Sequence, residues 1–231
     1  MTTGTELTTF ITGLNADATV DPTLLAVLVQ TAQAILEQER PWMRLRKTDS
    51  SLSVTTSNAW NTAKSLAGIT DFSTFYGETP IRLYDGSNLV QEFYQRPWDR
   101  RLEFKDVSGT FVYDAANNTV YINGAVSSNG TLYTSYISTS TQIDPTSASA
   151  VWTAFPSRFL PLIGFYAIGV YKGAVDYDSI NRQMLPSNQA VMLALKNAME
   201  KWDNDLQMSE VINNDPTEIG AGPRVGAVDR E

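Results

Sequence analysis

Two helical patterns that enclose a β-type region are the feature of this chain that most constrains its fold. Residues 7–14 place Leu7, Phe10, Ile11 and Leu14 at the i, i+3, i+4, i+7 spacing of one helix face. Helical spacing returns in residues 159–170 and 191–206, whereas residues 50–143 are rich in Thr, Ser, Val, Ile and Tyr with recurring Gly and Asn turns. The pattern predicts an α+β fold in which helices from both ends of the chain flank a β-domain.

We expect a discontinuous helical domain of residues 1–48 and 150–208, made of N-terminal helices and two long C-terminal helices. Residues 49–149 form the inserted antiparallel β-domain in this prediction. From Ser209 the helical spacing is lost and Pro and Gly accumulate, so residues 209–231 are predicted to form an extended arm.

Local signals place the helix ends. Asp21 followed by Pro22 is typical of an N-cap and first turn, and the second helix should end near Arg40. Its apolar face is predicted to consist of four residues and an intervening Ala32, namely Leu24, Val27, Leu28 and Ile35. A third helix is expected between Pro156 and about Asp178.

The last helix should begin at Pro186 and bury a stripe of five apolar residues: Val191, Leu195, Met199, Trp202 and Leu206. Gly169 and Gly173, four residues apart, predict a close approach of two helices in the core.

Three turn signals predict strand pairing in the β-domain. Residues 85–88 (Asp-Gly-Ser-Asn) and 114–118 each separate two alternating segments, as in antiparallel hairpins. Residues 128–130 (Ser-Asn-Gly) precede the strand-like residues 131–137 and are interpreted as a further hairpin turn, because Asn-Gly suits positive φ.

The composition argues against an enzyme. The chain contains no His and no Cys, which removes the commonest general base, the commonest metal ligand and every thiolate. Asp176 with Asp178 and Asp203 with Asp205 bring carboxylates together, but neither pair has the other ligands of a calcium loop. We therefore predict no cofactor and no metal site, with a hydrolase that uses two carboxylates as the enzymatic alternative.

No export signal or membrane span is predicted. The N-terminus lacks a basic region followed by an apolar stretch. Residues 159–171 form the longest apolar run, which is shorter than the roughly 20 residues that a span requires, so this run is interpreted as a buried core helix. We expect synthesis in a host cytoplasm and no contact with membranes.

Two basic clusters oppose the net charge of −8. The first contains Arg40, Arg44, Arg46 and Lys47, and the second contains Arg96, Arg100, Arg101 and Lys105. Each lies beside a tryptophan, Trp42 or Trp98, which is compatible with nucleic-acid contact or with simple capping and packing. On an acidic chain we favour binding to acidic surfaces of neighbouring protein subunits. Pro216, Pro223 and Arg224 in the predicted arm are further candidates for partner binding.

The layout resembles the head-to-tail adaptor proteins of tailed bacteriophages. In that family amphipathic N-terminal helices lead to a β-rich insert, which ends in a stretch like residues 130–137. A Phe-Pro pair like Phe155-Pro156 then precedes a long helix like residues 159–167, and a segment like residues 171–178 precedes the closing helix. The resemblance covers most of residues 5–207.

This resemblance implies a structural virion protein of the neck, also called a connector or head-completion protein. Such proteins form homo-oligomeric rings, commonly of twelve copies, between the portal protein and the tail or nozzle proteins. Viral DNA would pass through the channel without specific binding, and an acidic wall favours this passage because it repels the duplex. The alternative is another tail, capsid-decoration or receptor-binding protein whose β-domain contacts a glycan or a virion protein.

Overall fold

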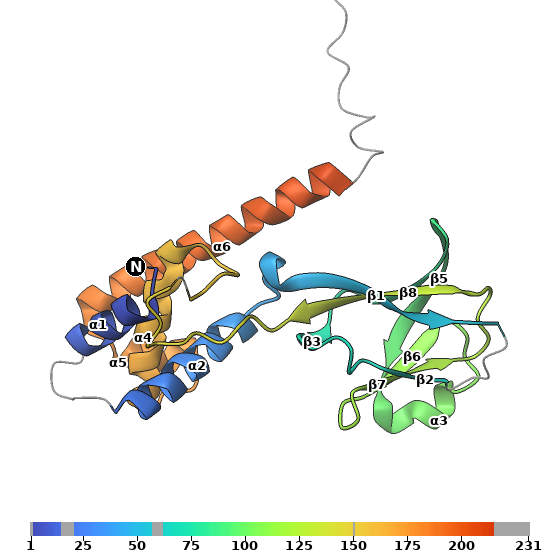
Figure 1. The fold of residues 1–231 in the computed structure, drawn as a ribbon, viewed down its shortest axis with the longest axis horizontal. Helices are drawn as coiled ribbons and strands as arrows, with labels where there is room; N and C mark the ends of the chain where they lie inside the picture. The colour runs from blue at the N-terminus through green and yellow to red at the C-terminus, as the bar shows by residue number, and fades with distance from the viewer. Residues whose placement is uncertain (1, 15–20, 57–61, 150, 215–231) are drawn as a thin grey trace, which may run out of the picture. The chain divides into compact units, whose positions relative to one another are not determined.

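The computed structural model describes residues 2–14, 21–56, 62–149 and 151–214, and it has the α+β architecture expected from the sequence. Its contacts divide the chain into two units (Figure 1). The helical unit contains residues 1–39 and 142–231, and the β-unit contains residues 40–141. Both ends of the chain therefore contribute to one helical unit, and the sheet is inserted between them.

The N-terminal helices are α1 (Gly4–Leu14) and α2 (Pro22–Gln38). The side chain of Asp21 accepts hydrogen bonds from the backbone N–H groups of Thr23 and Leu24, which confirms the predicted N-cap. The predicted apolar face of α2 was partly wrong, because Leu24 and Val27 are exposed. The helix instead buries a neighbouring stripe: Leu25, Leu28, Val29, Ala32 and Leu36.

The C-terminal helices are η3 (Ser157–Phe159), α4 (Leu160–Tyr171), α5 (Tyr177–Gln183) and α6 (Pro186–Asn214). Nearly every side chain of α4 is buried, because α1, α2, α5 and α6 all pack against it. The single helix predicted between Pro156 and Asp178 is divided after α4, where Gly173 has a φ of +87°. A Cβ at Gly169 would lie 2.6 Å from Ile180 Cγ1, so the predicted close approach of two helices is confirmed there.

The last helix differs from its predicted form in two respects. Val191 is half exposed, whereas Met192 and Met199 are fully buried. Leu195 and Trp202 are only partly buried. The helix also continues to Asn214 and does not end before Ser209, since residues 209–214 contain no Gly or Pro.

A buried polar contact connects three helices of the helical unit. The hydroxyl of Tyr166 on α4 donates to Glu39 Oε1 over 2.6 Å, directly after the end of α2. Lys196 Nζ on α6 forms an ion pair with Glu39 Oε2 at 2.7 Å and lies 3.5 Å from the ring centroid of Tyr177. Burial, with the nearby Glu39 carboxylate, raises the pKa of Tyr166. The phenol therefore remains a donor to Glu39 well above neutral pH.

The β-unit contains the strands β1 (Arg46–Val54), β2 (Thr62–Ser65), β3 (Phe72–Phe75), β4 (Ile81–Asp85), β5 (Asn88–Arg96), β6 (Thr110–Asp114), β7 (Thr119–Asn123) and β8 (Gly130–Ser138). In the described residues the strand order is β1-β8-β4-β5-β6-β7-β2, and β3 also pairs with β8. Every pairing is antiparallel except that of β5 with β6. The apolar residues of these strands form the core of the unit, which includes Ile81, Phe93, Phe111 and Leu132.

The hairpins predicted at residues 85–88 and 114–118 are confirmed as β4–β5 and β6–β7. The hairpin predicted at residues 128–130 is wrong, because β8 pairs with β1, β3 and β4 and not with the preceding β7. Strand β1 begins at Arg46, within the segment that was assigned to the helical domain. No helix in the described ranges is both long and apolar enough to cross a bilayer.

Candidate functional site

The first basic cluster lies at the start of the β-unit and is largely engaged in contacts within the chain. Arg40 Cζ lies 5.1 Å from the ring centroid of the fully buried Trp42. Arg46 Cζ lies 4.3 Å from the Tyr76 ring centroid, and its Nε donates to the Pro41 carbonyl. Three of the four basic side chains thus have structural contacts, since Lys47 is ion-paired as well.

Lys47 bonds to Asp71, which also accepts a hydrogen bond from the hydroxyl of Tyr136 at 2.9 Å. Burial alone would raise the pKa of Asp71, but these two donors hold it below its usual range. Arg44 is exposed and has no ion pair among the described residues. Of the first cluster, Arg44 is the side chain most available to a partner.

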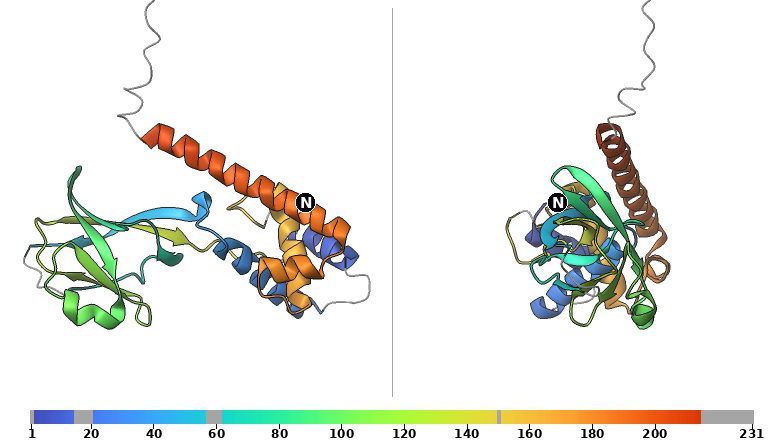
Figure 2. Two further views of the ribbon diagram at one scale, coloured as in Figure 1. Left: turned by 180° about the vertical axis from the view of Figure 1, so that it is seen from behind. Right: turned by 90° about the vertical axis from the view of Figure 1, so that its right-hand side faces the viewer.

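The second basic cluster lies on the connection between β5 and β6. Parallel strands cannot be joined by a tight turn and need a crossover of about a dozen residues. Residues 97–109 form this crossover and contain η2 (Trp98–Arg100) and α3 (Arg101–Phe104). Figures 1 and 2 show α3 at the opposite end of the β-unit from the start of β1. The sheet topology therefore separates the two predicted clusters.

Aromatic rings organise the second cluster. Arg101 Cζ lies 4.5 Å from the ring centroid of Trp98, and the Trp98 ring lies 5.5 Å from that of Tyr121 on β7. Such cation–π contacts contribute about 0.5–1 kcal/mol at exposed sites. Tyr121 was not identified from the sequence, because only the pairing of β7 with β6 in the sheet brings it close to the crossover.

A second ring holds the other two arginines. Arg96 Cζ and Arg100 Cζ lie 5.3 and 5.6 Å from the ring centroid of Phe104. Arg100 Nε also donates to Glu103 Oε2 at 3.0 Å, and this bond raises the pKa of Arg100. Arg101, in contrast to Arg100, has no carboxylate partner among the described residues, so no nearby negative charge compensates its positive charge there.

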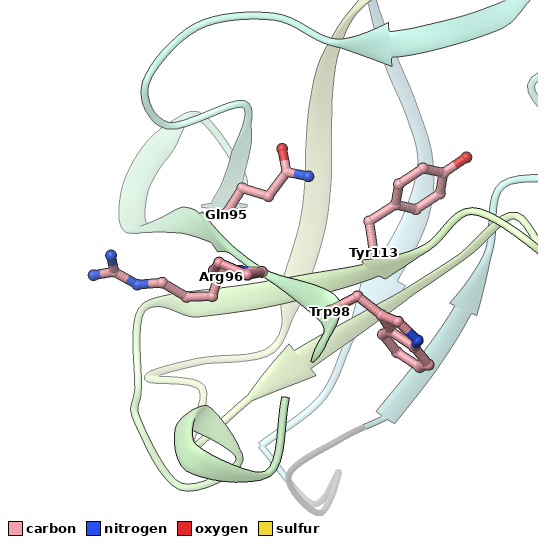
Figure 3. A pocket seen from close by; sticks show the side chains of 5 residues that line it. Gln95, Arg96, Trp98 and Tyr113 are labelled. Carbon is pink, nitrogen blue, oxygen red and sulfur yellow. The ribbon is translucent and has the colours of Figure 1, made fainter. Parts of the chain in front are cut away.

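An open depression of about 370 Å³ lies beside these rings, lined by Gln95, Arg96, Pro97, Trp98 and Tyr113. In Figure 3 the guanidinium of Arg96 points away from Tyr113, while Gln95, Tyr113 and Trp98 surround the depression. Next to Arg101, the Leu102 side chain is 71% exposed. We call the surface formed by Gln95, Arg96, Trp98, Arg101 and Leu102 the α3 surface.

The α3 surface contains arginine and tryptophan, two residue types that are enriched at protein interfaces. Trp, Tyr and Arg are the residue types that contribute most to binding energy at protein interfaces. Leu102 is a large apolar side chain that remains exposed, and Trp98, four residues before it, lines the depression. The arginines favour an acidic partner, and the aromatic rings favour an apolar side chain of that partner.

The two units differ strongly in charge. The β-unit contains ten Lys and Arg and nine Asp and Glu, a net charge of +1. The helical unit contains seven Lys and Arg and sixteen Asp and Glu, a net charge of −9. The entire acidic excess of the chain thus belongs to the helical unit.

One member of each carboxylate pair, Asp176 or Asp203, has a place in the helical structure. Asp176 accepts a hydrogen bond from the Ser179 N–H at 2.8 Å and caps α5, and its pKa is lowered first by the Ser179 hydroxyl. Asp203 is buried on α6. Within the described residues no three Asp or Glu side chains come together as metal ligands would.

The remaining candidates, Pro216, Pro223 and Arg224, lie outside the described residues. The structure adds Gln95, Tyr113, Tyr121 and Leu102 to the residues predicted at the second cluster. Comparison with known proteins gives no matching family model and no curated protein of significant similarity.

Proposed function

We propose that this protein is a structural virion protein of a tailed bacteriophage, a connector that forms a ring between the portal and the tail. The supporting observation is the discontinuous helical unit, in which α1, α2, α5 and α6 pack on α4, while a mostly antiparallel sheet is inserted between α2 and α4 in the sequence. The resemblance of the sequence to the adaptor family rests on the same order of helices, β-rich insert and further helices.

Exposed apolar side chains support assembly into an oligomer. On the helical unit these include Leu24, Val27, Val175, Leu185 and Val191, each at least 43% exposed. Scattered exposed apolar residues are common on monomers, but several of them on helices α2 and α6 and on the connections before α5 and α6 are suited to packing against other copies. The portal, tail or nozzle proteins and passing DNA are the partners that this function implies, and the neck of the virion is its place.

The charge distribution supports a channel that does not bind DNA specifically. A net charge of −9 on the helical unit repels a duplex at distances up to a Debye length of about 8 Å at physiological salt. Most arginines of both clusters already contact aromatic rings or a carboxylate within the chain, which leaves them less available to phosphates. We assign the contacts that the clusters make outside the chain to neighbouring protein subunits and not to DNA. A structural role without catalysis or cofactor is part of the same proposal.

The depression lined by Trp98 and Tyr113 favours one alternative, a receptor-binding or decoration protein. Aromatic rings beside Gln95 and Arg96 are suited to bind a sugar or a peptide loop. In that case the β-unit would act on an external ligand, and the helical unit would serve as its anchor.

The mass of the purified full chain separates these functions. A ring of twelve 25.5 kDa chains has a mass of about 306 kDa, which light scattering after size-exclusion chromatography distinguishes from a trimer. A large closed oligomer is the expected result. A stable trimer that binds glycan would favour the receptor-binding alternative, and a monomer at high concentration would contradict ring assembly.

A further inference from the structure

Helix α2 is apolar on both of its faces. Its inner stripe is buried where the helix packs on α4, yet the opposite face carries Leu24, 43% exposed, and Val27, 55% exposed. Residues 22–36 contain no charged side chain. A helix at the surface of a protein normally turns charged and polar residues outward, whereas a helix that is apolar all round is buried. We therefore expect the outer face of α2 to be covered in the assembled protein.

The exposed residues of α2 follow one line along the helix. From Leu24 onward they are Leu24, Val27, Thr31, Ala34 and Gln38. Steps of three and four residues alternate between them, which is the spacing at which one helix packs lengthwise against another. We call this line of uncharged residues the α2 stripe.

Helix α6 carries a second line of this kind. The exposed residues on one side of its first half are Ser187, Ala190, Val191, Ala194 and Ala198, and all of them are uncharged. We call this line the α6 stripe. Residues 183–195 contain no charged side chain, and Lys196 is bound to Glu39 within the helical unit. Lys201, which is exposed, is the next charged residue on the side of the α6 stripe.

The two stripes fit together when the helices run in opposite directions. With Val27 opposite Ala194, the large side chain of Leu24 lies opposite the small Ala198. A helix rises about 1.5 Å per residue in either direction, so both stripes advance by equal distances along the contact. Larger side chains of one stripe thus meet smaller ones of the other, as close packing requires.

Charge selects the same direction. In this alignment Asp21, which precedes the α2 stripe, lies opposite Lys201, which follows the α6 stripe. Both side chains are exposed, and neither forms an ion pair with a described residue. If the helices ran in the same direction with the same central contact, Lys201 would lie beside Ala34 and no cation would lie opposite Asp21.

We propose that the α2 stripe of one copy packs antiparallel on the α6 stripe of a neighbouring copy. This inference rests on the proposed ring, in which every copy presents both stripes. The two stripes are different, so the contact is heterologous, and heterologous contacts generate closed rings when the rotation between neighbours closes. The occupant is a second copy because this chain itself supplies the uncharged line that covers α2 and the cation opposite Asp21.

One charge on each stripe tests this contact in the full-length protein. Each of the variants V27K and A194E should raise the dissociation constant of the oligomer about tenfold or more, because assembly then buries a charge without a partner. The double variant V27K/A194E should restore assembly, since an ammonium and a carboxylate then face each other. Sedimentation velocity over a range of protein concentrations measures all three.

Two matched controls place the same charges outside both stripes. V175K changes a 76% exposed valine on the connection before α5. L193E changes a 48% exposed residue of α6 that lies about 100° around the helix from Ala194. We expect both controls to assemble like the unchanged protein, and thermal unfolding should show that all variants are folded. Equal assembly of V27K and V175K, or no restoration in V27K/A194E, would overturn the proposed contact.

Disulfide trapping gives an independent measurement, because the natural chain contains no cysteine. Oxidation of V27C/A194C should produce a ladder of covalent multimers under non-reducing conditions. The control pair V175C/A194C should not produce this ladder. A covalently closed monomer of V27C/A194C would show that the two stripes meet within one chain and would overturn the contact between copies.

The outcomes separate this inference from the ring itself. If the unchanged protein forms a large ring and V27K forms it equally well, the contact is wrong and the proposed function stands. If the unchanged protein is a monomer at high concentration, both are wrong. If V27K forms the ring but no longer co-sediments with portal-containing capsids, the α2 stripe binds the portal and the contact between copies is wrong.

Discussion

Replacement of Tyr166 by Phe tests whether the buried polar contact holds the two ends of the chain together. The substitution removes one hydroxyl from a fully buried ring and leaves the ring in place, so it creates almost no cavity. The lost bond is the 2.6 Å hydrogen bond to Glu39. Glu39 would remain largely buried, at 17% side-chain exposure, with Lys196 as its remaining partner.

A hydrogen bond to a charged group contributes about 1.5–3 kcal/mol, and burial here limits screening by solvent. We expect Y166F to lower the free energy of unfolding of the helical unit by this amount. Urea unfolding followed by far-UV circular dichroism measures it, because most of the helical signal comes from this unit. The control Y171F removes a hydroxyl from a 43% exposed tyrosine on the same helix and should change stability by less than about 0.5 kcal/mol.

A double-mutant cycle with Glu39→Gln assigns the loss to this pair. If Tyr166 acts through Glu39, the two substitutions should couple by about 0.5–3 kcal/mol. Stability of Y166F within about 0.5 kcal/mol of the unchanged protein, or fully additive effects in the cycle, would refute the structural role given to this contact.

Three further predictions follow from the helical unit. Met199→Ala should cost about 2–5 kcal/mol because its side chain is fully buried, whereas Val191→Ala, at a half-exposed position, should cost less than about 0.5 kcal/mol; thermal and urea unfolding measure both. Burial raises the pKa of Tyr166 above its ordinary value of 10.0, so its stabilising contribution is complete below pH 10 and is lost as the pH rises beyond it. The melting temperature should therefore fall above about pH 10, and less steeply in Y166F. Deletion of residues 215–231, which contain the partner-binding candidates Pro216, Pro223 and Arg224, should leave the melting temperature unchanged and weaken co-sedimentation with portal-containing capsids. Equal co-sedimentation would show that these residues do not bind the capsid.

Local signals predicted most elements of this fold, because they depend on residues that are close in the chain. Asp21-Pro22 caps α2, Pro186 begins α6, and residues 85–88 and 114–118 form the expected hairpins. Each signal depends on the backbone preference of one or two residues, and the surrounding structure does not change that preference.

Burial was predicted less well where nearly every position is apolar. In α2, residues 24–29 are Leu-Leu-Ala-Val-Leu-Val, so two neighbouring stripes satisfy the helical spacing equally well. Packing against α4 selects the stripe that contains Leu25 and Val29. The same ambiguity affects α6, where Met192 is buried in place of Val191.

The candidate site depended on pairings between distant strands, which no local signal specifies. The parallel pairing of β5 with β6 places Gln95 opposite Phe111 and brings Tyr113 beside the crossover. The sequence identified the arginines and Trp98 through their composition alone. It did not identify Tyr113, Tyr121 or the exposed Leu102, because their proximity results from the sheet and not from their spacing.

Electron microscopy of the purified full-length protein tests ring assembly most directly. The proposed function predicts particles with a central opening and rotational symmetry, commonly twelvefold by resemblance to the adaptor family. The helical units should lie in contact around the opening. Single chains of 25.5 kDa, or compact trimers without an opening, would contradict the assignment of this protein to the neck of a virion.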